Sequence, residues 1–172
     1  MIEKDSEMSD YSQPGAEEEG EFSLSRDRIP VRSMTEDDLA AIVRIDRKVT
    51  GRDRTAYYER KFKEAMSESG LRVSLVAEEN GIPAGFILAR VDFGEFGKTE
   101  PAAVIDTLAV EPDRAGRGVG RALLSQLFVN LAGLQVETVR TTVAWDNFDL
   151  LRYLKGRGFA PSQRLVLTRR VA

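Results

Sequence analysis

The 172-residue sequence contains no histidine and no cysteine. This absence excludes the catalytic triads and dyads that depend on an imidazole or a thiolate. Structural zinc sites are built from these two residue types, and catalytic zinc sites almost always use histidine, so we expect no metal. Disulfide bonds are impossible, which excludes the small disulfide-stabilised secreted domain as a class.

Long apolar runs are also missing from the sequence. No run approaches the roughly 18 residues that a membrane helix needs. The N-terminus shows no charged segment followed by an apolar one, as a signal peptide would. We therefore expect a cytoplasmic protein with no membrane partner, and the length suits a single domain with its own core.

Charge is unevenly distributed behind the net value of -3. Residues 1–27 hold nine acidic and two basic residues, a balance of -7, so the rest of the chain carries +4. The acidic segment has too few apolar residues to order itself, which predicts a disordered tail at 1–27 before one domain at 28–172. The negative total gives no reason to expect a nucleic-acid partner.

Apolar periodicity predicts an α/β fold with a mixed (α+β) sheet. The dipeptide Asn80-Gly81 lies between two alternating segments and predicts a β-hairpin. At least one strand-helix-strand crossover follows, so we expect a mixed, mostly antiparallel sheet of about six to seven strands flanked by about four helices. Strands are predicted at 29–33, 72–79, 82–92, 101–110, 136–145 and 163–170, and helices at 35–46, 55–67, 118–132 and 147–157.

The stretch from 110 to 124 runs from a strand through a glycine-rich turn into a helix. A helix N-terminus offers unpaired N–H groups and a positive dipole end to an anion. Glycines let the backbone approach a phosphate closely, and guanidinium groups match its oxygens. These features predict a pyrophosphate-bearing ligand, with a plain tight turn as the alternative; the residues are Gly116, Gly118, Gly120, Arg114, Arg117 and Arg121.

Two common nucleotide motifs do not fit this turn. A phosphate-binding loop of the Walker type needs Gly-Lys-Ser/Thr, which is absent. The dinucleotide fingerprint needs a further glycine where Arg121 and Leu123 stand.

The turn resembles the signature of the Gcn5-related N-acetyltransferases (GNAT). That signature is a strand ending in Val-x-Pro, followed by Arg/Gln-x-x-Gly-x-Gly/Ala opening a helix. Val110, Pro112, Gly118 and Gly120 match it, whereas Ala115 occupies the Arg/Gln position.

A second part of the chain also resembles this family. Asn147 follows the next predicted strand and opens a helix, and Gly158-Phe159 stands at the expected separation beyond it. The order of elements from Ile29 to Val171 agrees as well, so the resemblance covers nearly the whole chain except the tail.

The resemblance implies direct acetyl transfer from acetyl-CoA, as co-substrate and without a metal, to the primary amine of a small molecule or a protein. Acetyl-CoA would enter where the sheet splays between 103–110 and 138–145. Homodimers are common in the family, whereas the sequence itself does not show the oligomeric state. The implied cofactor-binding residues are Leu108, Ala109 and Val110 for the pantetheine arm, Ala115, Gly116, Arg117, Gly118, Val119, Gly120 and Arg121 for the pyrophosphate, and Asn147, whose alternative role is a helix cap.

Asp106 is the first candidate for the general base. An ammonium must lose a proton before it can attack, and without histidine the base is a carboxylate or water. Aspartate is disfavoured in strands, and alternation places Asp106 on one face with Val104 and Leu108. A purely structural role is the alternative, and Glu100 and Asp146 are further candidates.

Tyr153 is the candidate for the general acid. Many members of the family use a tyrosine seven residues after the asparagine, and Leu154 stands there. Tyr153 is its neighbour, rotated by about 100° around a helix. The acid is therefore Tyr153 after a local shift, a water molecule, or no group at all.

The family selects its acceptor with the first two helices, which are basic here. This charge suggests an acceptor with anionic character, and the alternative is a solvated helical face. A CoA-binding regulatory module with little turnover is the rival function, because Ala115 and Leu154 depart from the motif. The acceptor candidates are Arg44, Arg47, Lys48, Arg52, Arg54, Arg60, Lys61, Lys63, Tyr57 and Tyr58.

Overall fold

The computed structural model describes residues 29–67, 73–93, 100–163 and 165–171. The predicted acidic tail at 1–27 and the first residue of the predicted strand at 72–79 lie outside these ranges. The chain divides into two compact units, residues 1–140 and 141–172.

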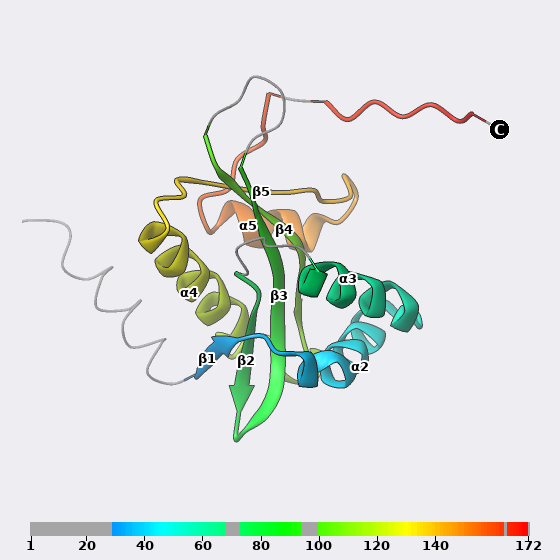
Figure 1. The fold of residues 1–172 in the computed structure, drawn as a ribbon, viewed down its shortest axis with the longest axis vertical. Helices are drawn as coiled ribbons and strands as arrows, with labels where there is room; N and C mark the ends of the chain where they lie inside the picture. The colour runs from blue at the N-terminus through cyan, green and yellow to red at the C-terminus, as the bar shows by residue number, and fades with distance from the viewer. Residues whose placement is uncertain (1–28, 68–72, 94–99, 164, 172) are drawn as a thin grey trace, which may run out of the picture. The chain divides into compact units, whose positions relative to one another are not determined.

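The first unit is built on a sheet in which the strands follow their order in the chain, β1-β2-β3-β4-β5 (Figure 1). Strands β1 to β4 pair antiparallel with their neighbours. This arrangement confirms the predicted α/β class, with five strands in the described residues rather than six to seven. The strands are β1 (Val31–Ser33), β2 (Leu75–Glu79), β3 (Ile82–Asp92), β4 (Ala102–Val110) and β5 (Thr138–Thr141).

The β2–β3 hairpin forms at the predicted place. Asn80 and Gly81 connect the strands with φ values of 52° and 73°. A two-residue turn of this type needs positive φ at both positions, which glycine and asparagine adopt at low cost. The hairpin prediction is confirmed.

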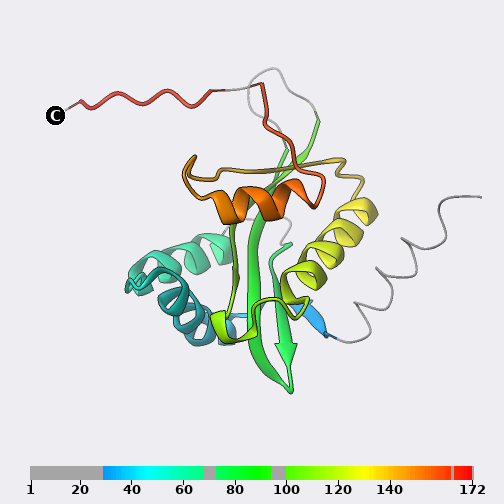
Figure 2. The same cartoon turned by 180° about the vertical axis from the view of Figure 1, so that it is seen from behind.

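Helices cover the two faces of β2 to β4 (Figures 1 and 2). One face carries α2 (Leu39–Thr50), which follows the short 3-10 turn η1 (Glu36–Asp38), and α3 (Thr55–Ser67). The other face carries α4 (Val119–Gly133). The three predicted helices of this unit are therefore confirmed, with α2 running four residues beyond its predicted end.

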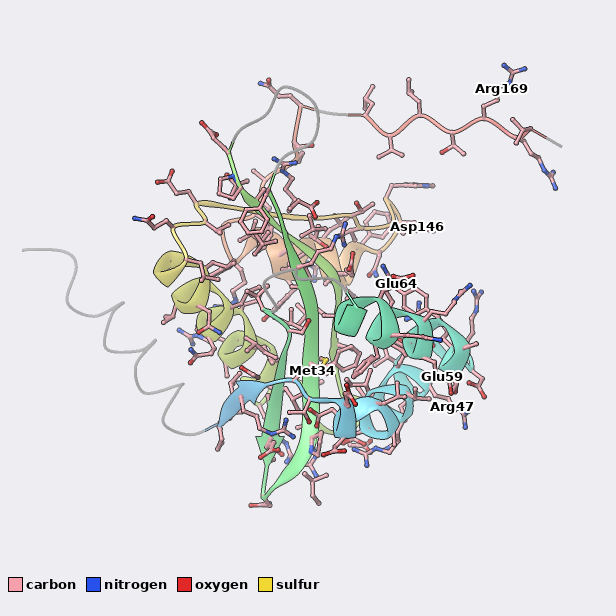
Figure 3. All side chains as sticks on the ribbon, in the orientation of Figure 1. Met34, Arg47, Glu59, Glu64, Asp146 and Arg169 are labelled. Carbon is pink, nitrogen blue, oxygen red and sulfur yellow. The ribbon has the colours of Figure 1, made fainter. Side chains whose placement is uncertain are left out.

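A core of apolar side chains joins α2 and α3 to the sheet. Amphipathic spacing on the two helices directs these side chains inward, and burying each one contributes about 1.5–3 kcal/mol. Met34 packs against this cluster from the segment after β1 (Figure 3). The cluster contains Ile42, Ile45, Tyr58, Phe62, Val76, Phe86, Leu88 and Ala109.

The opposite face brings α4 unusually close to β3. A Cβ atom on Gly85 would lie 2.8 Å from Val119 Cγ1 and 2.9 Å from the carbonyl oxygen of Ala109. Only glycine leaves room for the helix at this point. Gly85 thereby sets how closely the first turn of α4 approaches the sheet.

The second unit contains one helix, α5 (Phe148–Lys155). Asn147 begins it, and its side-chain oxygen accepts a hydrogen bond of 3.3 Å from the Leu150 N–H. Gly158 follows with φ 85°. The predicted helix is confirmed, and its end, predicted near Arg157, lies at Lys155.

Two strand predictions near the C-terminus are wrong. The strand predicted at 136–145 shortens to β5, and the described residues of 163–170 form no strand. Leu165, Val166 and Leu167 are 88%, 83% and 89% exposed, so the alternating side chains have no surface to cover. Alternation indicates which residues suit a strand, but a strand also needs a neighbouring edge to pair with.

Among the described residues, no helix is both long and apolar enough to cross a membrane.

Candidate functional site

A β-bulge in β4 places Asp106 outside the regular pairing with β3. Leu88 pairs with Thr107 and Ala89 pairs with Ile105, which leaves Asp106 as the extra residue. A bulge inserts one unpaired residue and shifts the alternation of side chains beyond it. The sequence pattern does not predict this bulge, because it indicates regular alternation over the whole strand at 101–110.

The bulge overturns the expectation that Asp106 and Leu108 share a face. Leu108 pairs with Ile87, which lies on the same face of β3 as Gly85 and therefore faces α4. Asp106 instead reaches Arg90, which pairs with Val104. The two faces of β4 are thus exchanged on either side of the bulge.

Asp106 forms a hydrogen-bonded ion pair with Arg90. This hydrogen bond is the main reason that the pKa of Arg90 lies above its ordinary value. The Asp106 residue as a whole is exposed, but its side chain is only 21% exposed. Most of the surface that this residue presents to water therefore belongs to its backbone. Of the other base candidates, Glu100 and Asp146 are both exposed, and Asp146 is labelled in Figure 3.

At the end of β4, successive side chains point alternately to the face of the sheet covered by α2 and α3 and to the face covered by α4. Ala109 is buried in the core cluster under α2 and α3. Leu108 and Val110 are half-buried on the α4 face, where Val110 pairs with Gly85. Glu111 extends the strand pairing by one further bond, from its N–H to the Ala84 carbonyl at 2.8 Å.

The glycine-rich turn leads into an uncapped helix. After the 3-10 turn η2 (Pro112–Arg114), Gly116 and Gly118 adopt φ values of 76° and 90°. Gly118 is the N-cap of α4, and no side chain caps the helix. The first hydrogen bond of α4 joins the Ala122 N–H to the Gly118 carbonyl at 2.9 Å.

An anion would meet favourable groups at this helix end. The N–H groups of Val119 and Gly120 precede the first helical hydrogen bond, so they have no acceptor within the helix. No atom lies within 4 Å of the position that a Cβ on Gly116 would occupy. Ala115, Gly116 and Arg117 are exposed. The turn therefore has the donors, the dipole and the space that a phosphate group needs.

The arginines of the turn differ in what they bind. Arg114 contacts two carboxylates, with its Nη1 at 2.8 Å from Glu79 Oε2 and its Nε at 3.4 Å from Glu111 Oε2. Its charge is thus neutralised within the protein and does not replace an arginine at position 115. Arg117 has a side chain that is 62% exposed, and its Nη1 lies 3.6 Å from Glu79. Arg121 is half-buried in the first turn of α4.

Glu111 is the residue of this region that sequence reasoning missed. Its side chain is only 8% exposed, and its Oε1 accepts a hydrogen bond of 2.5 Å from Lys48 Nζ on α2. The partners are 63 positions apart, so no local pattern connects them. A cavity of about 410 Å³ borders the pair and is lined by Lys48, Glu79, Asn80, Glu111, Asp113, Arg114 and Arg117.

In the second unit, each predicted residue has a local role. Asn147 caps α5, which confirms the alternative that sequence reasoning kept open for it. Leu154, at the position of the family tyrosine, is buried. The Arg157 guanidinium lies over the Tyr153 ring at 5.5 Å from its centroid, within the range of a cation–π contact.

Most basic residues of α2 and α3 are engaged within the protein. Arg44 bonds the Pro83 carbonyl, Lys48 pairs with Glu111, and three others pair with nearby carboxylates. Arg47 lies on the outer side of α2 and Glu59 on that of α3 (Figure 3). Tyr58 is fully buried, and Tyr57 is half-buried. Four cations make no side-chain ion pair with any described residue, and one of them, Arg44, is still held by the Pro83 carbonyl; the other three are Arg52, Arg60 and Lys63.

Within the described ranges, no group of three or more carboxylates is placed to hold a metal ion.

A sheet whose bulged strand β4 leads through a glycine-rich turn into an uncapped helix defines the molecule as an α/β protein. Residues 39–159 match the model of the acetyltransferase (GNAT) family. The chain therefore belongs to this family, which confirms the family that the sequence motifs indicated.

Solved structures show the same fold. A transcriptional regulator from Bacillus halodurans is 20% identical, with a TM-score of 0.69 over 83% of this chain and 99% of that one. An aminoglycoside N-acetyltransferase in complex with CoA is 16% identical, with a TM-score of 0.71 over 84% and 95%. The ribosomal-protein-S18-alanine N-acetyltransferase from Escherichia coli is 24% identical, with a TM-score of 0.65 over 78% and 79%. No curated protein sequence matches the chain.

Proposed function

We propose that this protein transfers the acetyl group of acetyl-CoA directly to a primary amine. The observation that carries the proposal is the N-terminus of α4, which no side chain caps and which follows Gly116 and Gly118. The chain that carries it belongs to the acetyltransferase (GNAT) family. A helix end of this kind favours the pyrophosphate that CoA carries. The CoA complex of an aminoglycoside N-acetyltransferase with the same fold supports the choice of ligand.

Different residues bind different parts of acetyl-CoA in this proposal. The N–H groups of Val119 and Gly120 bind pyrophosphate oxygens, and Gly116 and Gly118 keep side chains out of the way. Arg117 and Arg121 add positive charge. The backbone of residues 108–110 binds the pantetheine arm, and Asn147 contributes its amide while it caps α5.

Acetyl-CoA supplies the acetyl group as a thioester. The amine nitrogen bonds to the carbonyl carbon, the carbon–sulfur bond breaks, and the sulfur leaves with its electron pair. The amine must first lose the proton that makes it an ammonium, and Asp106 accepts this proton directly or through water. Arg90 orients the Asp106 carboxylate for the task.

The departing thiolate takes up a proton, and Tyr153 supplies it in this proposal. Leu154, at the usual tyrosine position, has no proton to give and is buried. Arg157 over the Tyr153 ring favours the phenolate that donation leaves behind, because a cation is attracted to an electron-rich ring.

The acceptor carries an anionic group next to its amine in this proposal. Arg52, Arg60 and Lys63 are the cations of α2, α3 and their connection whose side chains make neither an ion pair nor a hydrogen bond with any described residue. An anionic amine would be attracted to them, whereas a polyamine would be repelled.

Release of free CoA thiol from acetyl-CoA tests the function across a panel of amines. The panel holds anionic amines, cationic polyamines, aminoglycosides and peptides with free N-termini. Thiol release that depends on the amine supports acetyl transfer, and preference for anionic amines supports the acceptor class. Polyamines as the best substrates would refute the acceptor class and leave the transfer reaction standing.

A CoA-binding regulatory module with little turnover is the second candidate. The favouring observations are Ala115 and the buried Leu154 at two motif positions. A transcriptional regulator from Bacillus halodurans also shares the fold. Tight CoA binding without thiol release on any amine would establish this function instead. Stabilisation by ATP or GTP, but not by CoA, would reject both candidates.

A further inference from the structure

A chain of ion pairs runs beside the glycine-rich turn and joins three separate elements. Lys48 on α2 contacts Glu111 at 2.5 Å, and Arg114 contacts Glu111 at 3.4 Å. Arg114 in turn contacts Glu79, at the end of β2, at 2.8 Å. We call these four residues the ion-pair chain.

The two inner members of the ion-pair chain are largely shielded from water. The side chains of Glu111 and Arg114 are 8% and 21% exposed, compared with 56% and 60% for the surface pair Arg47–Asp53. Exposed pairs contribute little, whereas removing one partner of a shielded pair leaves a poorly solvated charge behind. The hydrogen bond from Lys48 is the main reason that the pKa of Glu111 lies below its ordinary value.

The ion-pair chain holds the turn at its first residues. Glu111 and Arg114 flank η2, and the Arg114 N–H donates to the Glu111 carbonyl at 2.9 Å. The Ala115 N–H then donates to the Pro112 carbonyl at 3.2 Å. The segment is thus tied to α2 and to the β2–β3 hairpin immediately before its flexible part begins.

Packing alone does not hold the flexible part. Gly116 has open space at its Cβ position, and glycine has more backbone freedom than any other residue. The next firm anchor is Val119, which is 1% exposed and packs where Gly85 makes room for it. Between the ion-pair chain and Val119, the ion pair that holds residues 115–118 is the 3.6 Å contact of the exposed Arg117 side chain with Glu79.

We propose that Glu111 and Arg114 are positioning residues that order the turn before CoA arrives. Their charges are used on each other and on Lys48 and Glu79, so they act through the backbone of residues 115–120. Fixing one residue's backbone costs entropy that a pre-ordered turn has already lost before binding. This inference rests on the proposed binding of CoA pyrophosphate at the turn.

Removing Glu111 separates positioning from simple electrostatics. Glu111→Met deletes a negative charge beside the site of a polyanion, so charge alone predicts tighter CoA binding. Loss of positioning predicts weaker binding, because the turn must then be ordered when CoA binds. The two explanations therefore differ in the sign of the change.

The experiment is calorimetric titration of the full chain with CoA and with pantetheine, which lacks the pyrophosphate. Glu111→Met should weaken CoA binding about tenfold, equivalent to about 1.4 kcal/mol, and leave pantetheine binding within twofold. Glu79→Met, at the β2 end of the ion-pair chain with a side chain 18% exposed against 8% for Glu111, should act in the same direction and covers the case in which Glu111→Met fails to fold. Asp53→Asn, which breaks the surface pair with Arg47, is the matched control and should change neither constant.

A second measurement examines the free protein. Amide hydrogen exchange of residues 115–118 should be faster in Glu111→Met than in the wild type, with exchange in β3 unchanged. Arg114→Lys keeps the charge but not the two-sided contact, so it should fall between the wild type and Arg114→Met in both measurements.

Unchanged or tighter CoA binding by both methionine variants of the glutamates would overturn the inference. An equal loss for CoA and pantetheine would also overturn it, because the effect would then be general. Failure of the wild type to bind CoA would refute the proposed function itself, which distinguishes the two failures.

Discussion

Asp46 and Tyr58 share a hydrogen bond of 2.9 Å between α2 and α3, with Asp46 2% exposed and Tyr58 fully buried. Arg54 completes the arrangement by donating to Asp46 Oδ2 at 2.8 Å. A carboxylate in the interior is tolerated only when it is paired and hydrogen-bonded. This group therefore ties α2 and α3 to each other.

Replacement of Asp46 should destabilise the protein strongly. Asp46→Asn leaves the Arg54 guanidinium without its counter-charge in a partly buried place, which should cost about 3 kcal/mol. For a chain of this size we expect the melting temperature to fall by about 6–12 °C. Asp53→Asn is the control, because it breaks an exposed pair and keeps the side-chain oxygen that caps α3. Equal losses in the two variants would contradict this account.

Lowering the pH should remove the stabilisation that the ionised Asp46 provides. Burial by itself would raise the pKa of Asp46, but hydrogen bonds from Arg54 and Tyr58 outweigh it and hold the pKa below its ordinary value. A hydrogen bond from Arg32 likewise lowers the pKa of Asp38. The unfolded chain binds these protons at about pH 4, and the folded chain binds them only at lower pH.

The contribution of these carboxylates to the free energy of unfolding is therefore fully present above about pH 4. It is lost as the pH falls through the pKa values that these groups have in the folded protein. Urea unfolding at pH 7, 5 and 3 measures the effect. The wild type should be as stable at pH 5 as at pH 7 with respect to these groups and much less stable at pH 3. Asp46→Asn should lose less than the wild type between pH 5 and pH 3, and a parallel loss would argue against the assignment.

Gly85→Ala should disturb the packing of α4 against β3. The new methyl group would lie 2.8 Å from Val119 Cγ1 and 2.9 Å from the backbone oxygen of Ala109, so the helix must move. Overpacking of this kind costs about 1–3 kcal/mol. Gly133→Ala, at the end of the same helix with no atom within 4 Å, should instead stabilise by about 0.5–1 kcal/mol. Thermal unfolding of both variants checks the opposite signs.

Gly116→Ala should weaken CoA binding more than it lowers stability. Gly116 and Gly51 have φ values of 76° and 69°, and no atom lies within 4 Å of either Cβ position. Alanine in this conformation costs about 1–2 kcal/mol at both sites. Gly51→Ala, at the end of α2, is thus a control of equal strain. Titration with CoA should show a loss of affinity for Gly116→Ala alone, and the same loss in both would remove the turn from the binding site.

Asp106→Asn should lower turnover about a hundredfold at neutral pH, the lower end of the contribution of a general base. Asp92→Asn is the matched control, because Asp92 contacts the same Arg90 at 3.2 Å from the end of β3. Steady-state kinetics with the best amine of the panel provide the measurement. Full activity in Asp106→Asn would leave Glu100, Asp146 or water as the base.

Tyr153→Phe in the same assay should lower turnover at least tenfold, and unchanged turnover would reject its role as acid.

Local sequence was sufficient for the features that depend on near neighbours. The Asn80-Gly81 hairpin, the helix α3 and the cap at Asn147 each follow from a few adjacent residues, and each was predicted. The glycine-rich turn was found in the same way, because the glycine conformations and the helix start lie within ten positions of each other. Its match to a known signature led to the family, which the model over residues 39–159 confirms.

The β4 bulge and the ion-pair chain could not be obtained in this way. The bulge depends on how β4 aligns with β3, and it changes which side chains accompany Asp106. Lys48 and Glu111 meet only because α2 packs on the same sheet that β4 crosses. Arg114 looked like a phosphate ligand by spacing alone, and its neighbours in space are carboxylates.

By itself, the sequence determined that no histidine or cysteine side chain is available, where most of the helices and strands form, and where a glycine-rich turn opens a helix. Those properties are encoded in composition and in contacts between residues near one another in the chain. Only the tertiary structure decided which charges are neutralised and which stay exposed, because ion pairing depends on distance in space. It also left residues 165–171 without a strand partner, since a strand requires an edge that no local pattern supplies.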